Sequence, residues 1–228
     1  MGRTILPETE DIVRCWAVVY QETREAYPPN CFRNILKKFL FSILEGAEFC
    51  HHPELLRLMV SRPILDAVAA YLGTVPMLTG ARLCWSPENE TAQSSQLFHF
   101  DYEDLRQVKV FINIFETKED QGPLTFLPAD VSHQVQRAIG RVRDERIYEG
   151  GGRNHEVKLI GPPESGAFLD TSRCLHYGSR CNRRDRVVLI IQFLNCHSAF
   201  RPTAPFTVPR DLPGFEPDLV QKLDFGIH

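Results

Sequence analysis

The pattern of apolar residues changes once along the chain, near residue 74, and no other feature constrains the fold as much. Before this point apolar residues recur at helical spacing, which predicts helices over residues 7–20, 31–49, 53–59 and 63–72. After it, turn residues separate eight strand-like segments, at 76–85, 96–100, 107–115, 124–127, 157–160, 167–169, 174–177 and 187–194. This order predicts a mainly β protein in which helices pack on a double-sheet barrel of the jelly-roll kind.

The chain is predicted to form one domain, because 228 residues are an ordinary size for a single core. Residues 1–73 would form a helical part packed on the barrel, residues 74–196 the barrel itself, and residues 197–228 an extended tail. The charged segment 137–155 carries three consecutive glycines near its end. It is either a solvated surface loop or a mobile lid.

Composition excludes several classes of protein. The 26 basic and 29 acidic side chains give a net charge of −3, whereas nucleic-acid and anionic-membrane binding usually require a strong basic excess. No run approaches the roughly 20 apolar residues that span a bilayer, and the charged N-terminal residues leave no signal-peptide core. Seven widely spaced cysteines without Cys-x-x-Cys argue against a disulfide framework or zinc ribbon, so a cytoplasmic protein is expected.

The sequence Gln96-Leu-Phe-His-Phe-Asp101 carries the first candidate site. His99 and Asp101 are two residues apart on a predicted strand, so their side chains point to the same face. Together they supply two of the three ligands of a facial triad, the arrangement that binds non-haem iron(II). Chance predicts about one His-x-Asp/Glu in a chain with 8 histidines and 29 acidic residues, and the second example, His52-Pro-Glu54, is interpreted as a helix start.

Two downstream residues strengthen this interpretation. His176, within Cys174-Leu-His-Tyr-Gly-Ser179, is a candidate third ligand, and Arg186 follows it by ten residues at the start of an apolar strand. A near-continuous apolar strand is buried on both faces, so the guanidinium of Arg186 needs a partner. A dicarboxylate would be such a partner, because its oxygens match a guanidinium in a bidentate pair.

Alternation along residues 107–115 indicates which side chains face the barrel interior. The even positions are all aliphatic and are expected to pack on helices or on an outer sheet. The odd positions mix a lysine, an amide and aromatic rings, and they either line a ligand-binding interior or face water. Lys109, Phe111 and Asn113 are therefore candidates for the pocket, and the same reasoning adds Thr125 and Gln192.

The order His-x-Asp, distal His and then Arg resembles the iron(II)/2-oxoglutarate-dependent oxygenases, and specifically the phytanoyl-CoA dioxygenase family. Three further segments between residues 74 and 196 are similar to that family: Trp85-Ser-Pro, the stretch from Phe111 through Gln121-Gly-Pro to Pro128, and Gly166-Ala-Phe-Leu-Asp170. The resemblance implies a double-stranded β-helix that uses Fe(II), 2-oxoglutarate and O2, and it favours the interior for the mixed face.

The resemblance also implies roles for individual residues. Fe(II) would be bound by His99, Asp101 and His176. 2-Oxoglutarate would be bound by Arg186, Ser179, Thr125, Asn113 and Phe111, and the substrate pocket would be lined by Trp85, Lys109, Tyr102 and Gln192. The family's His-Gly-Ser is here His176-Tyr-Gly-Ser, which leaves the role of Ser179 open and makes Arg184 a rival of Arg186. Arg186 is preferred because it opens the buried strand, whereas Arg184 lies in the polar turn.

The implied reaction is oxidation of a small molecule, coupled to conversion of 2-oxoglutarate into succinate and CO2. A carboxylate at Asp101 favours hydroxylation or another oxidation over halogenation, because related halogenases have a small residue there. The short chain leaves little protein for a large acyl-CoA site. The sequence does not indicate the oligomeric state. Two alternatives stay open, a cupin-type metal enzyme that does not use 2-oxoglutarate and a non-catalytic ligand-binding barrel.

Other basic residues are interpreted as surface groups. His133 could be a ligand, but a surface position is favoured. The arginines at 137, 141, 143, 180, 183 and 184 are expected in solvated turns, with reception of an anionic substrate as the alternative.

Overall fold

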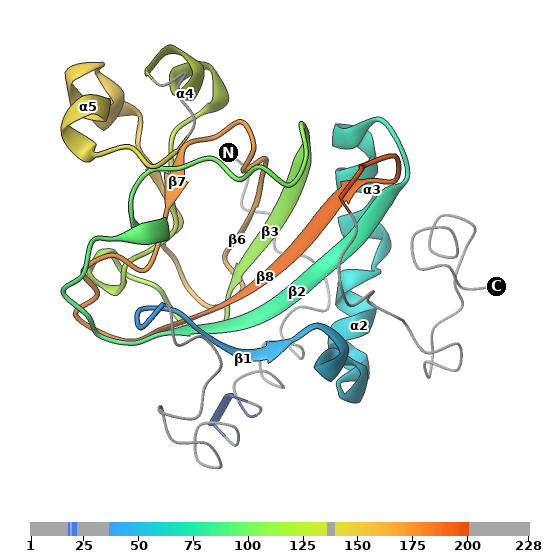
Figure 1. Ribbon diagram of the computed structural model, residues 1–228. Helices are drawn as coiled ribbons and strands as arrows, with labels where there is room; N and C mark the ends of the chain where they lie inside the picture. Colours follow the sequence, from blue (N-terminus) through green and yellow to red (C-terminus); the bar gives the residue numbers. More distant parts are fainter. Residues whose placement is uncertain (1–17, 19, 22–36, 136–139, 201–228) are drawn as a thin grey trace.

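The computed structural model describes residues 18, 20, 21, 37–135 and 140–200, and it contains two antiparallel β-sheets that face each other (Figure 1). The larger sheet has the order β1 (Phe41–Glu45), β2 (Pro76–Ser86), β8 (Arg186–Asn195), β3 (Gln107–Asn113) and β6 (Gly166–Leu169). The smaller sheet has the order β5 (Val157–Lys158), β4 (Thr125–Phe126) and β7 (His176–Tyr177). This architecture is the predicted double-stranded β-helix.

Two helices, α2 (Pro53–Met59) and α3 (Arg62–Leu72), run along the outer face of the larger sheet (Figure 1). Both were predicted, and their ends follow local rules. His52 is the N-cap of α2 and Pro53 follows it, as expected for a helix start. Gly73 ends α3 at a φ of 72°, a left-handed conformation that glycine adopts without steric cost.

The helices share a core with one face of the larger sheet. Val108, Val110 and Ile112 of β3 lie in a buried cluster with helix residues such as Leu55 and Leu65. The alternation therefore gave the correct orientation of β3. The opposite face of the sheet carries a second buried cluster, which includes Phe111 and Val188 and lies between the two sheets.

Two predicted elements differ in the structure. Residues 41–45 of the helix predicted over 31–49 form strand β1, because their backbone groups pair with the edge of β2. Residues 96–100 form no regular strand, and only Phe98 and His99 make isolated bridges. Helical propensity is a weak prior, and pairing with a long neighbouring strand overrides it.

The segment predicted as a loop over residues 137–155 contains a short helix, α5 (Asp144–Glu149), and a 3-10 helix, η5 (Gly152–His155). A further helix, α4 (Ala129–Val135), and three 3-10 helices, η2 (Gly46–His51), η3 (Ser94–Gln96) and η4 (Glu119–Gln121), complete the described elements. Most of the helix predicted over residues 7–20 and nearly all of the tail after residue 197 lie outside the described residues. Within the described residues no helix is long and apolar enough to cross a bilayer.

Candidate functional site

A two-residue pairing brings together chain segments that are far apart in sequence. His99 and His176 form an antiparallel bridge in which each backbone N–H donates to the carbonyl oxygen of the other at 3.1 Å. Side chains of directly opposed residues emerge on the same side, and here the two imidazole centroids lie 4.3 Å apart. Asp101 continues the segment by donating its backbone N–H to the oxygen of Thr171 at 2.9 Å.

The donor atoms of these three residues converge. One ligand atom from each of His99, Asp101 and His176 lies within 4.8 Å of the other two. The Nδ1 atom of His99 lies 2.8 Å from the Leu97 carbonyl oxygen, and that of His176 lies 3.0 Å from the Cys174 carbonyl oxygen. These contacts favour hydrogen on Nδ1 and leave each Nε2 lone pair available to a metal.

Lys109 is the partner of the carboxylate. Its Nζ donates to Oδ2 of Asp101 at 2.7 Å and lies 3.6 Å from Oε1 of Glu103. The residue is only 6% exposed, and an ammonium group is buried at acceptable cost only when it is paired. Asp101 therefore serves as its counter-ion, and the contact fixes the orientation of the carboxylate.

The charge state of the group suits a divalent cation. Burial would raise the pKa of Asp101, but its contact with the His176 ring and the ammonium of Lys109 hold that pKa well below its usual range. Burial, together with the neighbouring His176, lowers the pKa of His99 to about 4. At neutral pH Asp101 is therefore ionised and His99 is neutral, which are the forms that bind metals.

Arg186 lines another part of the same cavity. It is 5% exposed, and this burial lowers the pKa of its guanidinium to about 10. Nη2 donates to Oγ of Ser179 at 3.2 Å, whereas Nε and Nη1 have no hydrogen-bond partner among the described residues. Buried donors without partners are costly, and charge-assisted hydrogen bonds from a carboxylate would satisfy them.

Contacts among neighbouring segments hold the backbone beside this guanidinium. The backbone N–H of Ser179 donates to the carbonyl of Gly122 at 2.9 Å. Gly122 has a φ of 57°, and a Cβ atom there would lie 1.8 Å from Oδ1 of Asn182, so the close approach requires glycine. Asn182 donates to Oγ of Ser86 at 2.7 Å, and Ser86 is the β2 partner of Arg186. These contacts fix the start of β8 and the turn that carries Ser179.

The two neighbouring arginines have other partners. Arg184 forms a bidentate pair with Asp120, and its side chain is 55% exposed, so the structure places it outside the cavity. The prediction of a solvated turn is wrong for Arg180, which lies 3.6 Å above the ring centroid of Tyr177 and pairs with Asp144 of α5. The contacts of Arg180 therefore connect α5 to strand β7, the strand that contains His176.

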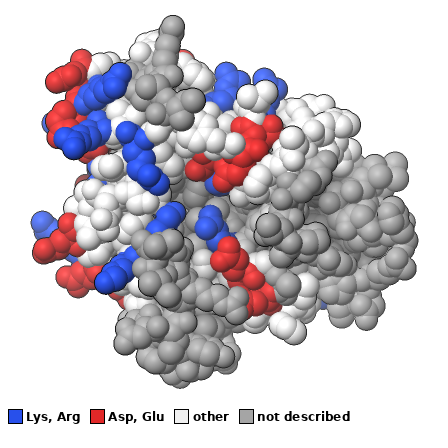
Figure 2. All heavy atoms as spheres, in the orientation of Figure 1, with Lys and Arg blue, Asp and Glu red and all other residues white. Residues whose placement is uncertain are grey.

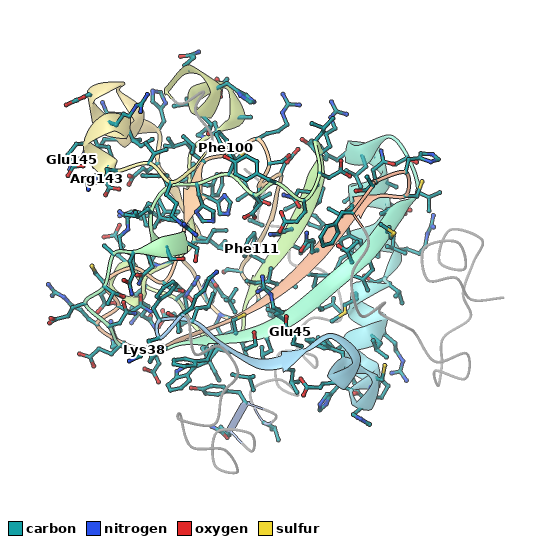
Figure 3. The ribbon with its side chains drawn as sticks, viewed as in Figure 1. Lys38, Glu45, Phe100, Phe111, Arg143 and Glu145 are labelled. Atoms are coloured by element: carbon teal, nitrogen blue, oxygen red, sulfur yellow. The ribbon has the colours of Figure 1, made fainter. Side chains whose placement is uncertain are left out.

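One cavity of about 110 Å³ joins the histidine–aspartate group to Arg186. Figure 2 shows a hollow near the middle of the displayed face, with lysine and arginine atoms beside it. Seven of the predicted site residues line this cavity: His99, Asp101, Lys109, Phe111, His176, Ser179 and Arg186. Phe111 lies between the two sheets in Figure 3, as the alternation along β3 predicts.

Five predicted residues do not line this cavity. Asn113 and Thr125 are buried nearby, where each donates to a backbone carbonyl, and Gln192 pairs with Gln107 on the inner face. Trp85 packs in the outer cluster with the helices, because it has the parity of the outward-facing β2 residues. Tyr102 is 57% exposed. His133 is also exposed, as its interpretation as a surface residue required.

Sequence reasoning missed two basic residues in the cavity wall, Lys37 and Arg82. Arg82 alternates with Ala81 and Leu83, which face the helices, so parity along β2 could have placed it inside. Lys37 precedes β1 in a turn and carries no periodic signal.

No protein-family model matches the chain, and no curated protein matches its sequence. Among solved structures, EctD from S. alaskensis with bound Fe has a TM-score of 0.64 at 15% identity, covering 97% of this chain and 78% of that one. The non-heme alpha-ketoglutarate-dependent carbocyclase SnoK from nogalamycin biosynthesis has a TM-score of 0.58 at 13% identity, covering 86% and 80%. The epimerase SnoN, in complex with Fe3+, alpha-ketoglutarate and nogalamycin RO, has a TM-score of 0.58 at 15% identity, covering 94% and 85%. At these identities the similarity establishes a shared fold.

Proposed function

We propose that this chain is a non-haem Fe(II)- and 2-oxoglutarate-dependent oxygenase that acts on a small molecule. The observation that carries the proposal is one cavity holding both a two-histidine, one-carboxylate donor set and a buried arginine with unused donors. The similar fold of EctD, solved with 2-oxoglutarate and 5-hydroxyectoine, and that of SnoN, solved with Fe3+ and alpha-ketoglutarate, support it.

The residues present fit these cofactors. Two imidazole nitrogens and one carboxylate are the donor set of facial iron(II) sites, which leave other coordination positions open. His99, Asp101 and His176 would hold the metal. Arg186, with Ser179 beside it, would hold the far carboxylate of 2-oxoglutarate, and this anion would satisfy the donors that the described residues leave unpaired.

When both are bound, iron and 2-oxoglutarate would supply the oxidising power for O2 chemistry, with release of succinate and CO2. The chain contributes position and environment. The carbonyl contacts of His99 and His176 hold their rings, and Lys109 orients the carboxylate of Asp101. Apolar residues of the wall, Leu40, Phe111, Leu124, Val188 and Ile190, would limit access of water to the reacting atoms.

Two finer assignments belong to the same proposal. The carboxylate of Asp101 occupies the position that halogenases leave to a small residue, so we assign hydroxylation or another oxidation rather than halogenation. The motif order His99-x-Asp101, His176 and Arg186 supports kinship with the phytanoyl-CoA dioxygenase family. The five residues between Asp101 and β3 leave little protein for a large acyl-CoA site, which supports a small substrate.

The test is an anaerobic titration of the metal-free protein with Fe(II) and then with 2-oxoglutarate, followed by the visible metal-to-ligand charge-transfer band. The wild type should develop the band, and Asp101→Ala and Arg186→Ala should weaken it. Arg184→Gln is the matched control, since it removes a nearby exposed arginine that lies outside the cavity. No band with both ligands in excess would contradict the proposal and favour a cupin-type metal enzyme or a non-catalytic barrel.

A further inference from the structure

Two cations of the cavity wall have no role in the proposed cofactor sites. Arg82 lies on the inner face of β2, opposite Glu45 of β1 and Ile190 of β8. Lys37 lies in the turn before β1 and lines the same cavity. The pKa of Lys37 is lowered mainly by burial and also by the positive charges of Arg82 and Arg141. These cations are therefore close enough to repel one another.

No carboxylate of the described residues lies within ion-pair distance of Arg82 or Lys37. Glu45 is the cross-strand neighbour of Arg82, but it forms a capping box with Glu48 at the start of η2. Figure 3 shows Glu45 on β1, at the edge of the larger sheet. Repelling cations that share a cavity wall would be stabilised by an anion bound between them.

The other charges of the cavity are already assigned. Lys109 is paired with Asp101, and Arg186 is assigned to the cofactor carboxylate. Fe(II) and 2-oxoglutarate carry opposite charges of equal size, so loading both leaves the excess of cations unchanged. The positive charges of Arg82 and Lys37 are therefore available to bind a further ligand.

Arg82 and Arg186 also enter the cavity from different positions along the sheet. Arg186 is paired with Ser86, four residues from Arg82 on the same strand. At about 3.3 Å per residue, the two backbone positions are about 13 Å apart. Ile190 of β8 and its cross-strand partner Phe111 of β3 line the same cavity and give this part of the inner face an apolar surface.

We propose that the substrate of this site is a small acid, whose carboxylate or phosphate group is bound by Arg82 together with Lys37 while its apolar part lies over Phe111 and Ile190. This inference rests on the proposed oxygenase function and adds the chemical class of the substrate. A guanidinium offers several donors to either anion, and an ammonium adds a second charge. The histidine–aspartate group lines the same cavity, so a substrate held there would be near the metal.

The experiment measures binding to the anaerobic Fe(II)- and 2-oxoglutarate-loaded protein, in which the cofactor occupies its own site. The probes are butyrate, monobutyl phosphate and their neutral counterparts butyramide and butanol, with affinities obtained by calorimetry or ligand-observed NMR. At least one anion should bind tenfold or more tightly than its neutral counterpart, and the better anion identifies the acid. The preference should fall about tenfold in Arg82→Gln, by less in Lys37→Gln, and should be partly retained in Arg82→Lys.

Arg184→Gln is the control for removing a positive charge outside the cavity, and it should keep the full preference. Equal affinities for acids and neutral counterparts in the wild type would overturn the inference. So would an unchanged preference in a folded Arg82→Gln protein, or a loss of 2-oxoglutarate affinity in that variant with unchanged probe affinity. The charge-transfer band of the same samples reports on the proposed function separately, since its absence in the wild type contradicts the oxygenase whatever the probes show.

Discussion

The two ends of the cavity differ in how completely the protein satisfies its own polar groups. At the histidine–aspartate end, both Nδ1 atoms contact carbonyl oxygens and Asp101 is paired with Lys109. At the arginine end, Arg186 has one contact, to Ser179, and two buried donors without a partner among the described residues. The first end is organised before any ligand arrives, whereas the second is complete only with an anion.

This difference shows where stability and ligand binding oppose each other. A fully paired group contributes to the folded state on its own, so changing it disturbs both the fold and the ligand. A buried guanidinium with unused donors costs stability until a ligand arrives, because its desolvation is only partly offset. Ligand-free stability and ligand affinity should therefore change in the same direction at the first end and in opposite directions at the second.

The largest effect is expected from removing a metal ligand. Changing a residue that merely supports a ligand costs about 10- to 100-fold in metal affinity, so His176→Ala should cost more than about 100-fold. Metal content and Fe(II) titration measure the loss. His133→Ala is the matched control, because this histidine is exposed and lies outside the cavity. Equal loss of metal in both variants would show that His176 has no special role.

The second prediction separates affinity from stability at the arginine end. Truncating one partner of a buried charge pair costs about 2–5 kcal/mol, so Arg186→Met should weaken 2-oxoglutarate binding by roughly 30-fold or more. The melting temperature without ligand should stay the same or rise, because an apolar side chain of similar length removes a poorly paired buried charge. Arg184→Gln should change neither quantity. A large loss of ligand-free stability in Arg186→Met would contradict the contrast between the two ends.

A smaller effect is expected from changing Lys109, whose ammonium group is paired with the carboxylate of Asp101. Lys109→Met should lower Fe(II) affinity by about 10-fold, because the carboxylate loses the contact that orients it. It should also lower the melting temperature, since the charge of Asp101 is then left without its partner. Lys109→Arg should recover part of both losses. Tighter metal binding in Lys109→Met would mean that the ammonium opposes the metal by charge rather than supporting its ligand.

The sequence predicted the fold best where a pattern extends over many residues. Strands β2, β3 and β8 and helices α2 and α3 each contain about two or more turns or alternations, so their type and orientation follow from spacing alone. Strand β1 was missed because its five residues are fixed by pairing with β2, which local sequence does not contain. Helix α5 was missed for a similar reason, since the contact between Asp144 and Arg180 joins distant parts of the chain.

The same dependence on contacts between distant parts of the chain explains which site residues could be predicted. His99 and Asp101 could be placed on one face by spacing, whereas the pairing of His99 with His176 depends on the sheet topology. Parity was applied to β3 and placed Lys109 and Phe111 correctly. It was not applied to β2, where it would have placed Arg82 inside and Trp85 against the helices. Lys37 enters the cavity from a turn, so no periodicity could reveal it.

The smallest effect is expected at Ser179, the one described contact of the Arg186 guanidinium. Ser179→Ala removes a hydroxyl but keeps the backbone bond to Gly122, so the turn should remain in place. A hydrogen bond to a charged group contributes about 1.5 kcal/mol or more, and its loss should weaken 2-oxoglutarate binding roughly tenfold. If the hydroxyl acts by orienting the guanidinium, the combined variant Ser179→Ala/Arg186→Met should bind 2-oxoglutarate no more weakly than Arg186→Met alone. Additive losses in calorimetric titrations would show that Ser179 contacts the cofactor independently of Arg186.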